Sequence, residues 1–298
     1  MKRVLVTGAS GFFGVHALKE LIERGYEVHA VGRRKVELQG TQFHPLDVFD
    51  TGAAAKLFRA VRPTHMLHLA WNVASGFWSA EDNIEWASAT ASLIRIFHQA
   101  GGQRIVGVGT CAEYDWQDLP PFINESHSRI PRTLYGSAKE STRQILAAYT
   151  RQVGISHAWA VLFMSYGPQE RAERLVPSVI RSILAGRATR TTSGTQIRDF
   201  LESRDVGAAL AALVDSPVEG AVNVASGQPL MLREIICKLG EIAGRPDLVR
   251  LGDVPSRPDE PTRLVADIAR LRQEVSFEPK ISLERGLADA IGWWRKQM

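Results

Sequence analysis

Apolar and polar positions along the first half of the chain predict short strands that alternate with longer helices. Val4-Leu5-Val6 is a short apolar run, and Val15, Leu18, Leu21 and Ile22 follow it at helical spacing. The pattern predicts further strands at residues 27–31, 65–69, 104–109 and 155–162, and helices at residues 52–61, 81–100 and 135–153. Repeated strand–helix units of this size are typical of a parallel sheet with helices on both faces.

The pattern changes after residue 167, where connections become longer and richer in Pro and Arg. We expect helices at residues 175–185, 203–215, 230–243 and 283–296. We therefore predict an α/β protein whose Rossmann-type, doubly wound parallel sheet lies in residues 1–167, joined by about 198–225. Residues 168–298 mainly form a smaller α+β domain over the carboxyl edge of the sheet, where open α/β folds bind their ligands.

A glycine-rich turn, Thr-Gly-Ala-Ser-Gly-Phe-Phe-Gly at residues 7–14, separates the first strand from the first helix. Gly8 allows a tight turn, Gly11 lets backbone amides approach a pyrophosphate, and Gly14 lets the helix lie close to the sheet. The amides at the start of that helix would face the phosphate charge. A glycine turn in some other α/β protein would have the same appearance, so the spacing alone leaves the ligand open.

The composition limits the partners and the location that we expect for the protein. The net charge is +4 with a pI near 9.2, and no run of Lys or Arg resembles a nucleic-acid arm. A site for a small anion explains this mild excess equally well. Two cysteines, no signal-peptide pattern and no apolar stretch of about 18 residues predict a soluble, cytoplasmic protein without membrane or nucleic-acid partners.

Two further features suggest acid–base chemistry. Tyr135 and Lys139 stand four residues apart on a predicted helix, so the phenol and the ammonium can reach one cleft. A nearby Lys⁺ would lower the pKa of the phenol and let it exchange a proton with a substrate oxygen. Thr110 ends the strand at 104–109 and would face the same cleft. Taken singly, the pair also fits an amphipathic helix with a solvated Lys, and Thr110 also fits a simple cap.

Together these features resemble the nucleotide-sugar epimerase/dehydratase group of the extended short-chain dehydrogenase/reductase family, over nearly the whole chain. Further matches are His68-Leu69-Ala70, Tyr166-Gly167-Pro168, Arg198-Asp199-Phe200 and Arg257-Pro258. The resemblance implies cofactor contacts at Gly8, Ser10, Gly11, Phe12, Phe13, Gly14, Asp47, Val48, Leu69 and Ala70. It implies catalysis by Thr110, Tyr135 and Lys139, the last two also touching the cofactor. It places substrate contacts at Thr110, Cys111, Met164, Arg198 and Arg257, where the arginines hold the diphosphate of a nucleotide sugar.

The end of the second strand bears on the choice of cofactor. An NAD site usually places an Asp or Glu there to accept a hydrogen bond from the ribose 2′-OH. This chain has Gly32-Arg33-Arg34, and its next carboxylate is Glu37. Two guanidiniums suit a 2′-phosphate, so we predict NADP, with NAD as the alternative. An exposed basic turn without a ligand would give the same sequence.

Departures from the family pattern narrow the reaction. Dehydratases of the family carry Asp-Glu after the catalytic Thr, where this chain has Cys111 and Ala112, so dehydration is not expected. Glu113 could be recruited instead, or it could simply pack or cap. Cys111 is a candidate acid–base for a C3/C5 epimerase, or a small buried side chain. Met164 replaces the usual Asn, which puts substrate contacts there in doubt.

The resemblance favours a 4-ketoreductase that transfers hydride from NADPH to the keto group of a nucleotide-activated sugar. A 4-epimerase with tightly bound NAD(P) is the alternative, and an NADP-sensing regulatory protein is a more remote one. The family also implies a homodimer, paired through the helices at 81–100 and 135–153. No Cys/His cluster suggests a metal, and we expect none.

Overall fold

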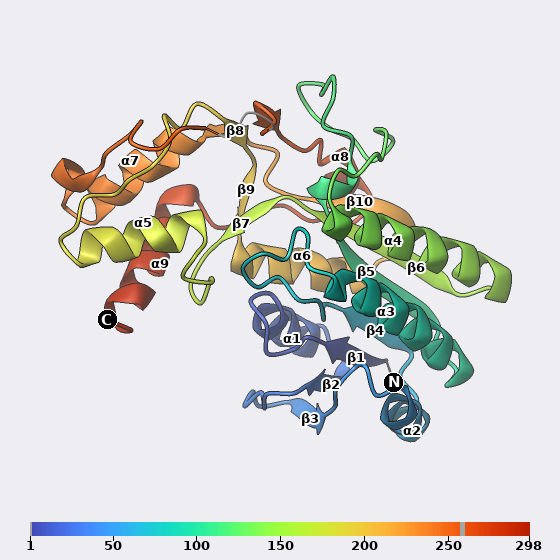
Figure 1. Cartoon of the computed structure of the whole chain (residues 1–298). Helices are drawn as coiled ribbons and strands as arrows, with labels where there is room; N and C mark the ends of the chain where they lie inside the picture. The colour runs from blue at the N-terminus through green and yellow to red at the C-terminus, as the bar shows by residue number, and fades with distance from the viewer. Residues whose placement is uncertain (1, 257–259) are drawn as a thin grey trace.

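The computed structural model describes residues 2–256 and 260–298, and a seven-stranded sheet forms its centre (Figure 1). The strands follow the order β10-β6-β5-β4-β1-β2-β3, and every neighbouring pair is parallel. Their bounds are β1 Arg3–Thr7, β2 Glu27–Gly32, β3 Thr41–Pro45, β4 His65–His68, β5 Arg104–Thr110, β6 Ser156–Leu162 and β10 Gly220–Val224. The predicted doubly wound parallel sheet is confirmed. The strand order reverses between β1 and β4, and ligands bind at such a reversal.

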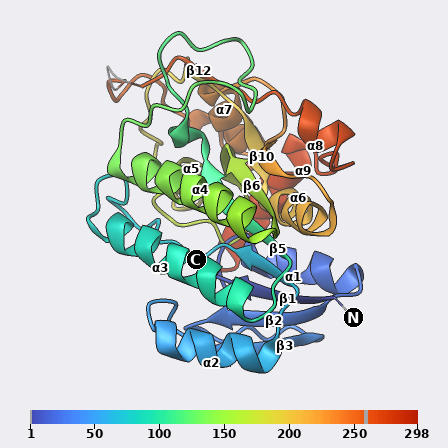
Figure 2. The ribbon, with the colours of Figure 1, turned by 90° about the vertical axis from the view of Figure 1, so that its right-hand side faces the viewer.

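Helices cover both faces of this sheet (Figures 1 and 2). Helices α1 (Gly14–Glu23) and α6 (Ser203–Asp215) pack together on one face, while α2 (Thr51–Val61), α3 (Asp82–Gln99) and α4 (Leu134–Val153) lie side by side on the other. The helices begin and end close to their predicted bounds, because their apolar positions recur at the helical period and side chains such as Asp50 and Thr133 cap their first turns.

The chain leaves the carboxyl end of β6 to build a second, smaller group of elements (Figure 1). Helices α5 (Leu175–Leu184), α7 (Leu232–Ile242) and α9 (Leu283–Arg295) surround a separate apolar core, in which Trp294 is buried. Short strands connect this group to the sheet: β7 (Met164–Tyr166) pairs with β9 (Phe200–Glu202), and β8 (Ile197–Arg198) lies between β11 (Leu230–Met231) and β12 (Arg263–Leu264). Helix α8 (Ala269–Gln273) packs against β10.

The sequence pattern missed two strands of the main sheet. Strand β3 lies at one edge of the sheet, half-exposed and ending in a proline, so it lacks a clear apolar pattern. Strand β10 lies at the other edge, and the buried Asn223 interrupts its apolar run. Helix α6, which follows the change in sequence pattern, packs under the main sheet against α1. None of the helices in residues 2–256 and 260–298 combines the length and apolarity needed to span a membrane.

The contact between α1 and α6 yields a prediction. A Cβ atom added at Gly207 would lie 2.4 Å from the Cβ of His16 and 2.8 Å from the amide nitrogen of Ala17. We expect Gly207→Ala to destabilise the protein by about 1–3 kcal/mol, because the helices must separate. Gly292→Ala on α9 is the control: no described atom lies within 4 Å of its added Cβ, so its effect should be neutral or stabilising by up to ~1 kcal/mol. Urea denaturation measures both, and equal effects would contradict the prediction.

Candidate active site

The glycine turn connects β1 to α1 with backbone that side chains would obstruct. Gly8 has φ +67°, and a Cβ on it would lie 2.8 Å from the amide nitrogen of Ala70. A Cβ on Gly14 would lie 2.5 Å from the carbonyl oxygens of both Gly8 and Ala9. The amide of Gly11 donates to the Gly8 carbonyl at 2.9 Å. No described side chain caps α1, and its first turn holds no acidic residue, so its uncapped amides suit an anion.

The end of β4 packs against this turn. The amides of Leu69 and Ala70 donate to the carbonyl and the hydroxyl of Thr7 at 3.2 and 3.3 Å. His68 is buried between the hydroxyls of Thr7 and Thr90, at 2.8 and 2.9 Å, and burial lowers its pKa to about 3. It is therefore a neutral part of the scaffold.

Exposed cationic side chains follow β2. Arg33 and Arg34 are both exposed immediately after Gly32, whose added Cβ would lie 4.0 Å from the hydroxyl of Ser10. Glu37 is exposed and forms an ion pair with Lys35 at 3.0 Å. Asp47 is also exposed and accepts the amide of Phe49 at 3.1 Å, while Val48 belongs to the core.

Thr110 ends β5 at the carboxyl edge and begins the short 3₁₀ turn η1 (Cys111–Glu113). Its hydroxyl accepts the amide of Ala112 at 3.3 Å, and its own amide donates to Glu113 at 2.8 Å. Thr110 therefore caps this turn, which is the simpler of its two interpretations. Its side chain also opposes the rise in the pKa of Tyr135.

Glu113 is fully buried beneath this turn. Its carboxylate accepts from Arg129 at 2.7 Å and from the indole of Trp159 at 3.1 Å. A Cβ on Gly109 would lie 2.1 Å from a carboxylate oxygen of Glu113, so only glycine fits there. Burial raises the pKa of Glu113 to about 7, while Arg129 opposes that rise. Glu113 therefore packs and caps within the scaffold.

Tyr135 is 8% exposed in the first turn of α4, and rings surround it. Phe77 and Trp78 meet it edge-on, with ring centroids 4.8 and 5.7 Å away. Its amide donates to the carbonyl of Trp78 at 3.1 Å. The segment that follows β4 is thereby fixed over the start of α4.

Lys139, one turn further along α4, is 5% exposed. Its Nζ donates to the carbonyl of Val108 at 2.9 Å and lies 3.8 Å from the ring centroid of Trp71. It is 6.0 Å from the centroid of the Tyr135 ring. Burial lowers the pKa of Lys139 to about 7, although Glu113 favours its charged form.

The expected lowering of the Tyr135 pKa by Lys139 does not occur in this structure. Burial raises that pKa, and Glu113 and Cys111 raise it further, while Thr110 and Arg174 oppose the rise. The reason is that the phenol has lost its water and the ammonium contacts Val108 and Trp71 instead.

The four substrate candidates beyond Thr110 have different surroundings. Arg198 is buried and donates to Glu260 at 2.7 Å. Its positive charge favours the thiolate form of Cys111. Burial raises the pKa of Cys111 to about 12, which disfavours the thiolate that an acid–base role requires. Met164 is half-buried at the start of β7. Arg257 lies outside the described residues.

Two residues near Tyr135 escaped the sequence analysis. Phe77 is buried against the Tyr135 ring, and the guanidinium carbon of Arg174, at the start of α5, lies 4.9 Å from the Phe77 ring centroid. The aromatic-rich stretch at residues 71–78 was a signal for Phe77. No motif signalled Arg174, because tertiary packing alone brings α5 to this edge.

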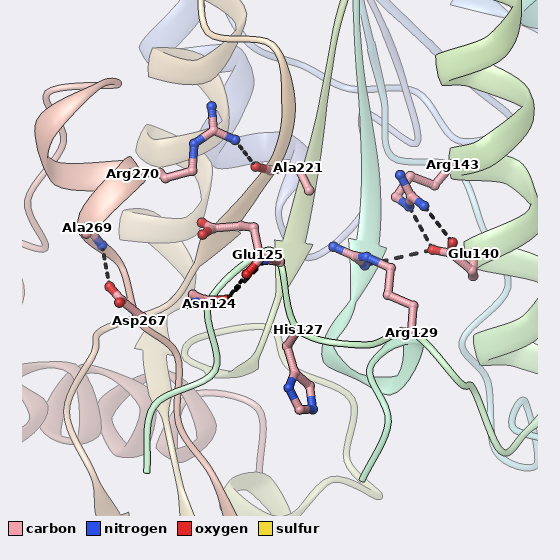
Figure 3. Close-up of a pocket in the computed structure, with 11 residues that line it drawn as sticks. Asn124, Glu125, His127, Arg129, Glu140, Arg143, Ala221, Asp267, Ala269 and Arg270 are labelled. Carbon is pink, nitrogen blue, oxygen red and sulfur yellow. Dashed lines mark hydrogen bonds and ion pairs between the residues drawn. The ribbon is translucent and has the colours of Figure 1, made fainter. Parts of the chain in front are cut away.

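The pocket in Figure 3, a cavity of about 760 Å³, lies beside β10 and does not include Thr110, Tyr135 or Lys139. Arg143 and Glu140 reach it from α4, and Arg270 reaches it from α8 (Figure 3). Two of its guanidiniums form hydrogen bonds within the chain: Arg143 donates to Glu140, and Arg270 donates to the carbonyl of Ala221 and to Glu274. Arg129 connects this pocket to Glu113, so it lies behind the end of β5.

The residues at the carboxyl edge fit a dinucleotide. The glycine turn and the uncapped amides of α1 suit a pyrophosphate, and the exposed Arg33 and Arg34 lie at the end of the neighbouring strand. Tyr135 and Lys139 lie beyond β4, at the end of β5. Within residues 2–256 and 260–298, no group of three or more His, Cys, Asp or Glu side chains could hold a metal ion.

The sequence is similar to a family model and to individual proteins over most of its length. The model of the NAD dependent epimerase/dehydratase family matches residues 4–225. UDP-glucuronic acid decarboxylase 1 of Xenopus tropicalis is 24% identical over 311 residues, covering 100% of this chain and 73% of the relative. dTDP-glucose 4,6-dehydratase of Escherichia coli is 24% identical, with 98% and 93% covered.

Solved structures agree on the fold. UDP-glucose 4-epimerase of Thermotoga maritima, solved with UDP-glucose, has a TM-score of 0.88 at 23% identity and covers 99% of both chains. MoeE5, solved with UDP-glucuronic acid and NAD, has a TM-score of 0.86 at 26% identity and covers 99% of this chain and 100% of MoeE5. The match to the family model extends over the glycine turn, Thr110, Tyr135 and Lys139 and over most of the chain. This protein therefore belongs to the NAD dependent epimerase/dehydratase family.

Proposed function

We propose that the protein is a reductase that uses NADPH to convert the 4-keto group of a nucleotide-activated sugar to an alcohol. The observation that carries the proposal is the chemistry at the end of β5. Tyr135 is a proton donor placed beside Thr110 and Lys139, whereas Glu113 is turned into the scaffold toward Arg129 and Trp159. A single proton donor suffices for carbonyl reduction.

NADPH bound along the glycine turn would supply the hydride that reaches the keto carbon. Tyr135 gives its phenolic proton to the carbonyl oxygen, so that the carbon and oxygen together gain one hydride and one proton. Thr110 donates a hydrogen bond to the same oxygen, which polarises the carbonyl. In the proposed reaction the ammonium of Lys139, which lies 6.0 Å from the centroid of the Tyr135 ring, acts on the phenolate once the proton has left. The surrounding rings of Trp71, Phe77 and Trp78 exclude water from this exchange.

The substrate class follows from the charges beyond the site and from the relatives. UDP and dTDP sugars occur in the names and complexes of related proteins. We assign Arg198 and Arg257 to the diphosphate, and Cys111 and Met164 to the sugar. Arg198 is held by Glu260 in this structure, so a diphosphate would replace a carboxylate as its partner. Residues 168–298 then mainly bind substrate, while residues 1–167, joined by about 198–225, bind NADP.

Tyr135→Phe tests the reaction. It keeps the ring among Phe77 and Trp78 but removes the proton donor, so the rate should fall by about 10²–10⁴-fold. The assay is the loss of NADPH absorbance with nucleoside diphosphate 4-keto-6-deoxyhexoses. Tyr149→Phe on the same helix, where the hydroxyl meets His98 at 3.1 Å, should stay within about twofold of wild type.

Two results of this assay would contradict the proposal. Turnover of a sugar nucleotide without net loss of NADPH would assign the protein as a 4-epimerase and contradict the reductase proposal. Activity that survives Tyr135→Phe unchanged would exclude Tyr135 as the proton donor.

The preference for NADP gives a second prediction. Replacing Arg33 and Arg34 together by Ser removes both exposed guanidiniums after β2. We expect KM for NADPH to rise by roughly 10–100-fold, because charge-assisted hydrogen bonds to the 2′-phosphate are lost. KM for NADH should change less than about threefold. Lys35→Ser is the control, because Lys35 pairs with Glu37. Equal effects on both cofactors would contradict the assignment.

We also propose a homodimer formed through α3 and α4. The two helices lie side by side on the outside of the molecule (Figure 2), and each leaves a large apolar side chain exposed. Ile84 on α3 is 60% exposed and Ile145 on α4 is 45% exposed. A two-fold contact through this surface would bury both side chains, and two-fold dimers are the commonest homo-oligomers.

Sedimentation tests the dimer. Wild type should sediment as a dimer, and the double variant Ile84→Glu, Ile145→Glu as a monomer, because two charges per subunit would be buried in the contact. Leu251→Glu, at an exposed apolar residue elsewhere, should leave the dimer intact. A monomeric wild type would refute the proposal.

A further inference from the structure

The ammonium of Lys139 is buried with few partners. It is 5% exposed, and the carbonyl of Val108, at 2.9 Å, is its hydrogen-bond acceptor in the described structure. An ammonium group has three donors, and the described side chains and backbone provide an acceptor for one of them. No carboxylate among the described residues comes within 4.0 Å of Nζ to form an ion pair. Burial of such a charge is costly unless something else compensates it.

The face of Trp71 provides that compensation. Nζ lies 3.8 Å from the centroid of the Trp71 ring, well within the range of a cation–π contact, and Trp provides the strongest such contact. Lys139 is buried and Trp71 is half-buried, so water competes less for the ammonium than it would at an exposed site. Tyr135, at 6.0 Å, is the second ring near the ammonium.

The Trp71 ring is held in place by Asn83 and Trp86. Its Nε1 donates to the side-chain oxygen of Asn83 at 2.9 Å, and Asn83 is fully buried. The Asn83 amide in turn donates to the carbonyls of Phe77 and Ala80, at 2.8 and 2.7 Å. Trp86 of α3 stacks on the Trp71 ring, with centroids 6.2 Å apart. Contacts within the chain therefore fix the orientation of the ring.

Three other ionisable groups face Lys139 from the elements packed around it. Glu113 of η1 favours the charged ammonium but pairs with Arg129. Tyr135 lies on the same helix, and its phenol is neutral because burial raises its pKa. His68 of β4 is neutral as well, since burial and Lys139 lower its pKa. None of these groups is an anion in direct contact with the ammonium.

We propose that Trp71 is a positioning residue that keeps the buried ammonium of Lys139 charged, through a cation–π contact with a ring that Asn83 and Trp86 hold in place. Its role in the reaction rests on the proposed function, because only a charged Lys139 stabilises the phenolate left on Tyr135. The contact itself involves two side chains of this chain, so it can be tested on the cofactor-free protein.

The direction of the pH effect follows from linkage. Burial lowers the pKa of Lys139 to about 7 in the folded chain, below the value of about 10.4 in an unfolded chain. Folding is therefore opposed by the buried charge at low pH, and this opposition fades as pH rises above about 7. Loss of the aromatic ring lowers the folded pKa further. The added loss of stability should appear below about pH 6 and vanish near pH 9, where folded Lys139 is neutral in either case.

The experiment compares Trp71→Leu with Trp71→Phe by urea denaturation of the cofactor-free protein at about pH 5.5 and pH 9. Phe retains a ring face, whereas Leu does not. The gap between the two folding equilibrium constants should be about tenfold larger at pH 5.5, which corresponds to a shift of one unit in the pKa of Lys139. Trp71→Met provides a second non-aromatic variant if the Leu variant does not fold.

The same pair in a Lys139→Met background completes the cycle. Packing losses persist there, but the gap should be the same at both pH values, because the charge is gone. A gap that does not change with pH when Lys139 is present overturns the proposal, and so does a pH-dependent gap that persists in the Lys139→Met background. Neither outcome depends on substrate, so failure of the reductase assignment would leave this result intact. With a substrate, the alkaline limb of kcat/KM should move to lower pH in Trp71→Leu and stay near wild type in Trp71→Phe.

Discussion

Removal of water from the carboxyl end of β5 is the constraint on which the rest of the site depends. Tyr135, Lys139 and Glu113 are all buried there, and burial is the largest cause of the pKa change of each. Each change favours the neutral form. The fold compensates the three groups differently: Glu113 receives a guanidinium, an indole and a backbone amide, Lys139 receives one carbonyl and a ring, and Tyr135 receives mainly aromatic surroundings.

That dry environment comes from segments far apart in the sequence. The stretch after β4 brings Trp71, Phe77 and Trp78 over the start of α4, and α5 brings Arg174 to the Phe77 ring. Strand β5 makes room for this packing with two glycines, because side chains at Gly107 or Gly109 would collide with Trp159 and Glu113. The core of the sheet and the site therefore share one requirement, which is close packing around the end of β5.

The sequence predicted the parts that depend on local pattern. Alternating strands and helices, the glycine turn and the positions of Thr110, Tyr135 and Lys139 could all be located before the structure was known. Strand β3 could not, because an edge strand need not be apolar on either face. The pKa of Tyr135 was expected to fall and instead rises, because the sequence gives the spacing of Lys139 but not its partners. Arg174 and Glu260 approach their partners only through tertiary packing.

The orientation of the Glu113 carboxylate bears on the choice between dehydration and reduction. Elimination of water from a sugar needs an acid and a base besides the group that handles the keto oxygen. Cys111 is buried with its pKa raised, Ala112 has no ionisable group, and Glu113 is committed to Arg129 and Trp159. Moving Glu113 toward a substrate would break the 2.7 Å ion pair of Arg129 and leave it the longer one to Glu140, at 3.8 Å, which is costly for a buried charge. The proposed reduction needs no such movement, since it assigns the proton to Tyr135 alone, and this difference is our reason for proposing a reductase rather than a dehydratase.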